Sequence, residues 1–139
     1  MPHFTVTDMQ PRRYLLDTCA FLWIASDDPN LSPKVREAFK DPENDIFLSA
    51  ASTWEIAIKV HLGKLSIKGP LKERIPEIRD LHGISPLPIE EEDTLAIGLL
   101  PILHKDPFDR VLIAQALTKG LCILTPDPDI RRYPILTMW

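Results

Sequence analysis

The residues Arg13-Tyr14-Leu15-Leu16-Asp17 form a short apolar run that ends at an acid, and the fold class follows from this segment. Apolar residues at successive positions are typical of a β-strand that is buried on both faces. Four later stretches also have strand-like composition, namely residues 45–49, 84–89, 121–125 and 135–139. Pro86 and Pro88 restrict the second of these to the edge of a sheet, since proline has no N–H for a central ladder.

Helical patterns separate these strands. Ser32 and Pro33 are a capping residue and a proline at the first helical position, which predicts a helix through Phe39. The next helix follows residue 49, ends at Gly63 and has one apolar stripe, formed by Trp54, Ile58 and Leu62. Further helices are predicted over residues 71–82, 90–100 and 106–119. Strands that alternate with helices predict an α/β fold with a mainly parallel sheet.

Size and composition indicate one domain in a reducing compartment. A chain of 139 residues buries enough surface to fold without disulfides or a structural metal. Cys19 and Cys122 are too few and too far apart for a disulfide framework or a zinc site. No apolar run reaches membrane-spanning length, and the N-terminal residues do not resemble a signal peptide. We expect a cytoplasmic protein with no membrane contact, a loose leader at 1–12 and one domain at 13–139.

The charge balance does not predict a protein that binds nucleic acid through bulk positive potential. The formal net charge is −4, from 20 acids and 16 bases. If four of the acids hold divalent cations, the remaining 16 acids balance the 16 bases. The composition therefore permits a nucleic-acid substrate without arguing for one.

Four acids occupy the positions where a parallel α/β fold builds its sites. Asp17 directly follows the first strand, and Asp127 stands two residues past residues 121–125. Asp109 lies in the first turn of a predicted helix, and Glu55 lies near the start of another. Ligands of such folds bind beyond the carboxyl ends of the strands. We therefore expect these four side chains to converge at one edge of the sheet.

Clustered carboxylates favour a divalent metal centre. Like charges a few ångströms apart raise each other's pKa, and Mg²⁺ or Mn²⁺ offsets that cost through carboxylate and water ligands. Such a centre lowers the pKa of a bound water and stabilises an in-line phosphoryl displacement. The chain has no Cys/His spacing typical of zinc, no glycine-rich phosphate loop and no G-x-S-x-G turn.

Each acid also has a purely structural interpretation. Asp17 could cap the helix that begins at Thr18. Glu55 could complete a capping box with Ser52, although Ser49 is an equally good cap. Asp109 could be an acid at a helix start, like Asp106 beside it. Asp127 could belong to a proline-rich turn. The pattern alone leaves both interpretations open.

Four blocks of the chain resemble PIN-domain proteins, specifically the VapC-type toxins of type II toxin–antitoxin systems. The blocks are residues 14–23, 49–59, 104–116 and 124–127, the last followed by Tyr133-Pro134 and Trp139. The third, His104-Lys105-Asp106-Pro107-Phe108-Asp109-Arg110, is the most specific. The blocks occur in the family's order and span the chain from Arg13 onward. One departure is Cys19, which stands where many relatives have His.

The resemblance implies a PIN-like (Rossmann-like) α/β/α sandwich with a mainly parallel sheet of about five strands. It implies a Mg²⁺- or Mn²⁺-dependent endoribonuclease that hydrolyses RNA phosphodiester bonds with a metal-activated water. The implied catalytic and metal-binding residues are Asp17, Glu55, Asp109 and Asp127. The implied partners are RNA, such as transfer or ribosomal RNA, a VapB-type antitoxin that alone contacts operator DNA, and a second copy of the chain.

Neighbouring residues are expected to support the four acids. Thr18, Thr125 and Asp106 would hold them in place, with Asp106 also capping its helix. Arg110 and Lys59 are the predicted RNA contacts, and His104 is interpreted as a structural donor rather than a base.

Three other functions compete with this prediction. A catalytically silent PIN-like module that acts by binding antitoxin or RNA is the main alternative. A phosphoacceptor receiver domain requires an acidic pair after the first strand, and a haloacid-dehalogenase-type phosphatase requires Asp-x-Asp there. The segment Asp17-Thr18-Cys19 has neither pattern.

Overall fold

The computed structural model describes residues 12–139. Apart from Arg12, the predicted leader lies outside the described residues. The elements in chain order are β1 (Arg13–Leu16), α1 (Thr18–Ser26), α2 (Pro33–Lys40), β2 (Asp45–Ser49), α3 (Ala50–His61), α4 (Leu71–His82), β3 (Ile84–Leu87), α5 (Glu91–Ile97), α6 (Pro107–Lys119), β4 (Cys122–Leu124), the 3-10 helix η2 (Ile130–Arg132) and β5 (Thr137–Met138). Among the described residues, no helix is both long and apolar enough to cross a membrane.

The five strands form one sheet in the order β3-β2-β1-β4-β5, and every neighbouring pair is parallel. β1 is central: Tyr14 is in register with Ile46 of β2 on one side and with Cys122 of β4 on the other. From β1 the chain builds outward through β2 and β3, and then crosses back to add β4 and β5. The strand order therefore reverses between β1 and β4, which is where parallel α/β sheets bind their ligands.

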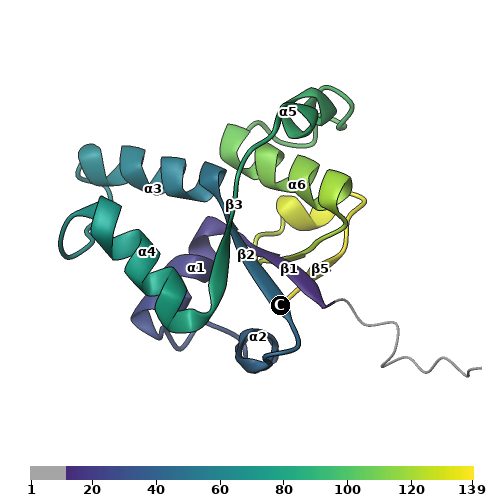
Figure 1. Cartoon of the computed structure of the whole chain (residues 1–139). Coiled ribbons are helices and arrows are strands. Elements are labelled where there is room, and N and C mark those ends of the chain that lie inside the picture. Colours follow the sequence, from purple (N-terminus) through teal and green to yellow (C-terminus); the bar gives the residue numbers. More distant parts are fainter. Residues whose placement is uncertain (1–11) are drawn as a thin grey trace, which may run out of the picture.

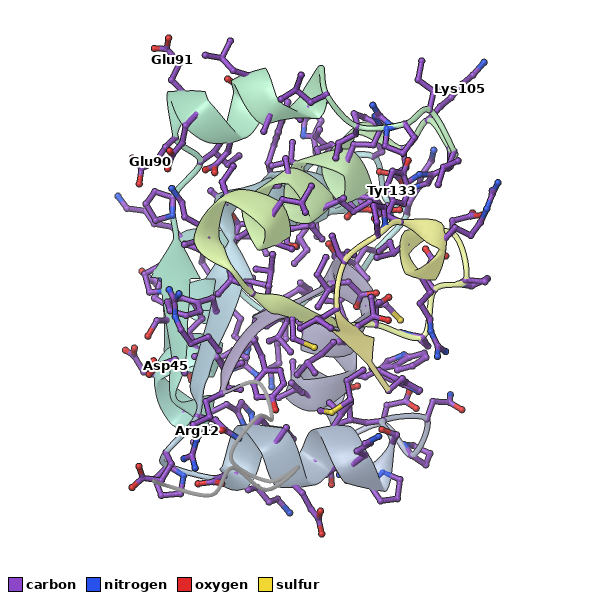
Figure 2. The ribbon with its side chains drawn as sticks, turned by 90° about the vertical axis from the view of Figure 1, so that its right-hand side faces the viewer. Arg12, Asp45, Glu90, Glu91, Lys105 and Tyr133 are labelled. Atoms are coloured by element: carbon purple, nitrogen blue, oxygen red, sulfur yellow. The ribbon has the colours of Figure 1, made fainter. Side chains whose placement is uncertain are left out.

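Helices cover both faces of the sheet, which confirms the predicted α/β/α sandwich (Figure 1). Alternate residues of β1 serve the two cores: Tyr14 and Leu16 pack with α1, α2 and α4, whereas Leu15 packs with α6. Figure 2, turned by a quarter turn, shows α5 and α6 in one layer and α2 in the opposite one. The double burial of β1 explains why its sequence is apolar at consecutive positions.

The predicted helix after residue 49 is present as α3, and its apolar stripe lies on the exposed side. Trp54 and Leu62 are 57% and 59% exposed, although they lie on the apolar stripe of the sequence. The buried side of this helix includes Ser52, Glu55 and Ile56. The helix therefore turns a partly polar side inward, because that side borders the cavity described below.

Element ends differ from the predictions by a few residues. α5 ends at Ile97 rather than residue 100, because Gly98 caps it. Pro76 lies inside α4 without delaying its start. β4 and β5 are shorter than the predicted stretches at 121–125 and 135–139.

Replacing Gly120 by alanine is expected to lower the free energy of unfolding by about 1 kcal/mol. Gly120 ends α6 at φ +66°, a left-handed conformation that costs a residue with a side chain about 1–2 kcal/mol. The matched control is Gly98→Ala, because Gly98 ends α5 at φ −63°, a conformation that any residue adopts. Urea denaturation of both variants checks the prediction, and equal losses in the two would contradict it.

Candidate active site

The structure brings all four predicted acids into the lining of one cavity of about 310 Å³. The cavity opens beyond the carboxyl ends of β1 and β4, at the reversal of strand order. The residues that line it are Asp17, Thr18, Cys19, Leu22, Trp23, Glu55, Lys59, Asp106, Asp109 and Asp127. Segments more than a hundred residues apart thus contribute to one site, as the positions of the acids predicted.

Asp17 both caps a helix and lines the cavity, so the two interpretations of this residue are compatible. Its side chain accepts a hydrogen bond from the backbone N–H of Ala20 at 2.7 Å and another from the Thr125 hydroxyl. Its own N–H donates to the Leu124 carbonyl at 3.2 Å, which ties the ends of β1 and β4 together. Burial raises the pKa of Asp17 to about 6, with Asp127 among the nearby charges that also raise it.

Glu55 lies well inside α3 and does not form a capping box. Ser49 caps the helix by accepting from the N–H of Ala51 at 3.0 Å. The Glu55 carboxylate is held from two sides: Thr18 Oγ1 donates to Oε1 at 2.7 Å, and Lys59 Nζ lies 2.8 Å from Oε2. Only 8% of Glu55 is exposed, so its charge is directed into the cavity and not to open solvent.

Asp106 and Asp109 have different roles at the start of α6. Asp106 is the N-cap, and its side chain accepts from the backbone N–H of Asp109 at 3.0 Å. The Asp109 side chain instead contacts His104, whose Nε2 lies 3.2 Å from Oδ2. Burial, followed by the neighbouring charge of Asp106, raises the pKa of Asp109 to about 7. The predicted capping function of Asp106 is thus present in the structure.

Asp127 belongs to a turn and also lines the cavity. Its N–H donates to Thr125 Oγ1 at 3.0 Å, and its Oδ1 accepts from the N–H of Asp129 at 2.8 Å. Thr125 therefore accepts from one acid's backbone and donates to the carboxylate of Asp17. This single buried hydroxyl links the acids that follow β1 and β4.

The chemistry of these side chains fits a hard divalent cation. The cavity presents carboxylate oxygens, the donors that Mg²⁺ and Mn²⁺ prefer. Burial, together with neighbouring carboxylates, raises the pKa of Asp17 and of Asp109, and a bound cation would favour their charged forms. Across residues 12–139, no three carboxylate, imidazole or thiol groups already stand together as a formed metal site. The carboxylates are held instead by Thr125, Lys59 and His104.

The two predicted RNA contacts lie in different surroundings. Lys59 lines the cavity and pairs with Glu55, and its side chain is 48% exposed. Arg110 points elsewhere, because its guanidinium donates to the carbonyls of Pro101 and Ile97 and to the hydroxyl of Tyr133. Contact of either residue with RNA stays a prediction, and the bonds of Arg110 do not favour it.

Sequence reasoning missed two side chains around the acids. Tyr133 is hydrogen-bonded to His104, which in turn contacts Asp109. No local spacing in the sequence indicates this contact. Ser52 is fully buried, with its Oγ 3.0 Å from Thr18 Oγ1. Its position three residues before Glu55, on the same side of α3, was the signal that could have identified it.

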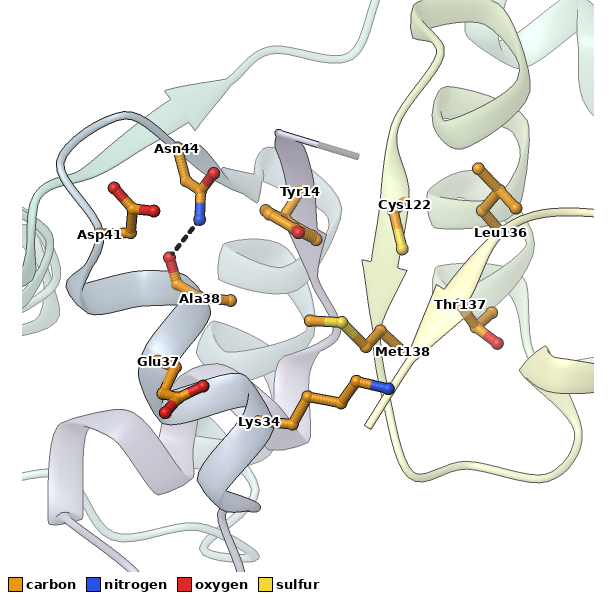
Figure 3. A pocket seen from close by; sticks show the side chains of 10 residues that line it. All are labelled: Tyr14, Lys34, Glu37, Ala38, Asp41, Asn44, Cys122, Leu136, Thr137 and Met138. Carbon is orange, nitrogen blue, oxygen red and sulfur yellow. Dashed lines mark hydrogen bonds between the residues drawn. The ribbon is translucent and has the colours of Figure 1, made fainter. Parts of the chain in front are cut away.

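A larger cavity of about 490 Å³ lies elsewhere in the molecule (Figure 3). It is bordered by α2, by β5, and by Tyr14 of β1 and Cys122 of β4, toward the amino ends of β1 and β4. Its polar side chains include Lys34, Glu37 and Asp41. The smaller cavity is the better candidate, because parallel sheets bind ligands at the carboxyl ends of their strands.

The fold and site together define a parallel α/β protein with a carboxylate-lined cavity at its topological switch point. The PIN domain family matches residues 14–136, so the chain belongs to the PIN domain family. A curated relative, Ribonuclease VapC16 of Mycobacterium tuberculosis, is 41% identical over 61 residues. That match spans 44% of this chain and 43% of the relative's length.

Solved structures support the same fold. VapBC2 from Rickettsia felis, bound to a promoter DNA fragment, has a chain that aligns with a TM-score of 0.69 at 14% identity, covering 91% of this chain and 98% of that one. DNA-bound VapBC from Salmonella typhimurium aligns with a TM-score of 0.64 at 16% identity, covering 91% and 96%. These likenesses confirm the predicted PIN-like fold.

Proposed function

We propose that this protein is a Mg²⁺- or Mn²⁺-dependent endoribonuclease and the toxin of a VapC-type toxin–antitoxin pair in the cytoplasm. The observation that carries the proposal is the convergence of Asp17, Glu55, Asp109 and Asp127 on one cavity at the switch point of a PIN domain. Similarity to a ribonuclease of the VapC type supports the choice of RNA as substrate.

In this proposal the four acids hold the cation. When bound, the cation lowers the pKa of a water molecule and offsets charge on the scissile phosphate. The chain's own residues set up that chemistry: Thr125 orients Asp17, and Thr18 orients Glu55. Lys59 offsets the charge of Glu55 at the rim of the cavity, where it is also the better placed of the two predicted RNA contacts.

The proposed protein partner is a VapB-type antitoxin, which would also provide the only contact with operator DNA. An apolar groove of about 400 Å³ lies between α1, the loop after α3 and α4. Leu22 and Trp23 line both this groove and the carboxylate cavity. A peptide seated in the groove would therefore reach the active site, which is how an antitoxin could block it.

We further propose that two copies of the chain associate. Trp54, Ile58 and Leu62 form an exposed apolar stripe on α3, and Trp54 packs edge-on against Phe108 with ring centroids 5.0 Å apart. Contiguous exposed apolar side chains of this kind favour a protein interface.

The function is tested with purified protein free of antitoxin on total RNA, with Mg²⁺, Mn²⁺ or a chelator. We expect cleavage with either cation and none with the chelator, followed by mapping of the new RNA ends. A protein that binds Mn²⁺ and antitoxin but cleaves no RNA would support the alternative, a catalytically silent PIN-like module. Cleavage that persists in chelator would refute the metal-dependent mechanism.

A further inference from the structure

Beside the carboxylate cavity, four side chains form a continuous row of hydrogen bonds; two come from α6, one from the segment before it and one from the residue after η2. Arg110 Nη1 donates to the Tyr133 hydroxyl at 3.0 Å, and the hydroxyl lies 2.7 Å from His104 Nδ1. His104 Nε2 then lies 3.2 Å from Asp109 Oδ2. Tyr133 follows η2, and Figure 2 shows it near the segment that carries Lys105, next in the chain to His104.

The number of available hydrogens determines which atom donates and which accepts in each of these hydrogen bonds. The Tyr133 oxygen receives two donors that cannot accept, Arg110 Nη1 and the backbone N–H of His104 at 3.3 Å. These occupy both lone pairs of the hydroxyl, so that its single proton is left for His104 Nδ1. A neutral imidazole that accepts at Nδ1 carries its proton on Nε2, and this proton points to Asp109.

The surroundings hold these groups in place. Tyr133 is buried, and its ring packs against the His104 ring with centroids 5.3 Å apart. Arg110 also donates to the carbonyls of Pro101 and Ile97, which anchors the segment before α6. The imidazole is thus enclosed between a fixed hydroxyl and the carboxylate.

We propose that His104 is a positioning residue for Asp109, kept in its Nε2–H tautomer by Tyr133 and Arg110. The hydrogen bond engages Oδ2 of Asp109 and so leaves Oδ1 for the cavity; among the described residues no donor contacts Oδ1. The inference rests on the proposed metal centre for its consequence, but the tautomer is a property of the protein alone. Outer partners of this kind typically change metal affinity by about 10–100-fold.

The tautomer is measured by nitrogen NMR of the imidazoles in metal-free protein at about pH 8, above the ordinary histidine pKa of about 6.5. The His104 signals are assigned by their loss in His104→Gln. We expect a proton on Nε2 in the wild type and a loss of this single tautomer in Tyr133→Phe. A proton on Nδ1 in the wild type would overturn the proposal.

Calorimetric binding of Mn²⁺ provides the second measurement. Tyr133→Phe and His104→Leu are expected to weaken Mn²⁺ binding by about tenfold or more. His104→Gln, which keeps an N–H donor of similar reach, should stay closer to the wild type. Tyr14→Phe, the same change in the chain's other tyrosine, is the matched control and should bind Mn²⁺ as the wild type does.

The outcomes separate this inference from the proposed function. Unchanged Mn²⁺ affinity in Tyr133→Phe and His104→Leu would refute the positioning role, even if RNA cleavage is found. A wild type that binds no Mn²⁺ would refute the metal centre and, with it, the role of His104 in metal binding. The NMR measurement would still decide whether Tyr133 and Arg110 keep His104 in its Nε2–H tautomer.

Discussion

Asp109→Asn is expected to reduce RNA cleavage by about two to three orders of magnitude. The amide keeps the shape of the side chain but removes the negative charge, and charge stabilisation by a bound cation contributes several kcal/mol to such reactions. Each 1.36 kcal/mol corresponds to a factor of ten in rate. Rates of cleavage at saturating Mn²⁺, with a labelled RNA that the wild type cuts, provide the measurement.

The matched control is Asp106→Asn, three residues earlier and also in the cavity lining. Asparagine caps helices about as well as aspartate, so α6 should be unaffected. We expect this variant to keep most of the activity, because the Asp106 carboxylate already accepts from the backbone N–H of Asp109. Loss of activity in Asp106→Asn with full activity in Asp109→Asn would reverse the two roles.

The metal-free protein is expected to lose stability as the pH rises from about 4 to 7. Burial raises the pKa of Asp17 to about 6 and of Asp109 to about 7, from an ordinary value of 3.8. A raised pKa in the folded state means that the native protein holds protons that the unfolded chain releases. Their contribution to stability is complete below about pH 4 and is lost as the pH rises through the folded-state values.

The size of this effect follows from the difference in pKa between the folded and unfolded states. A difference of one pKa unit between the two states corresponds to about 1.4 kcal/mol of unfolding free energy. The pKa values of Asp17 and Asp109 both differ by more than this, so the loss of stability should be large. Melting temperatures of wild type and Asp109→Asn in chelator, compared across this pH range, isolate the contribution of Asp109. The fall should be shallower in the variant, and saturating Mn²⁺ should restore the wild type at high pH, since a bound ligand stabilises the folded state. Parallel pH profiles for the two proteins would refute the assignment.

Local sequence signals were sufficient for much of the site. Caps at Asp17, Ser32, Ser49 and Asp106 mark helix starts that the structure confirms. A helix cap depends on a side chain and an N–H two or three residues away, so it is visible in a short window. The four acids stand out by their places after strands and in early helical turns, together with the resemblance to PIN domains.

Local signals did not decide which side of a helix faces the interior. The apolar stripe of α3 is exposed, whereas Glu55 and Ser52 lie on the buried side, where Glu55 lines the cavity. The guanidinium of Arg110 donates to Tyr133 and to two backbone carbonyls, which no local pattern indicated. Contact of Arg110 with RNA stays a prediction.

The strand and helix pattern, the parallel α/β class and the convergence of four acids on one edge of the sheet could all be predicted from the sequence alone. The pairing of particular hydroxyls with particular carboxylates could not be predicted, because it depends on contacts between distant segments. Thr125 and Asp17 are 108 residues apart, and His104 and Tyr133 are 29 apart. Such contacts depend on the strand order, which places β4 beside β1 and η2 beside the start of α6. No local propensity encodes that order, because it follows from burying both faces of one sheet at once.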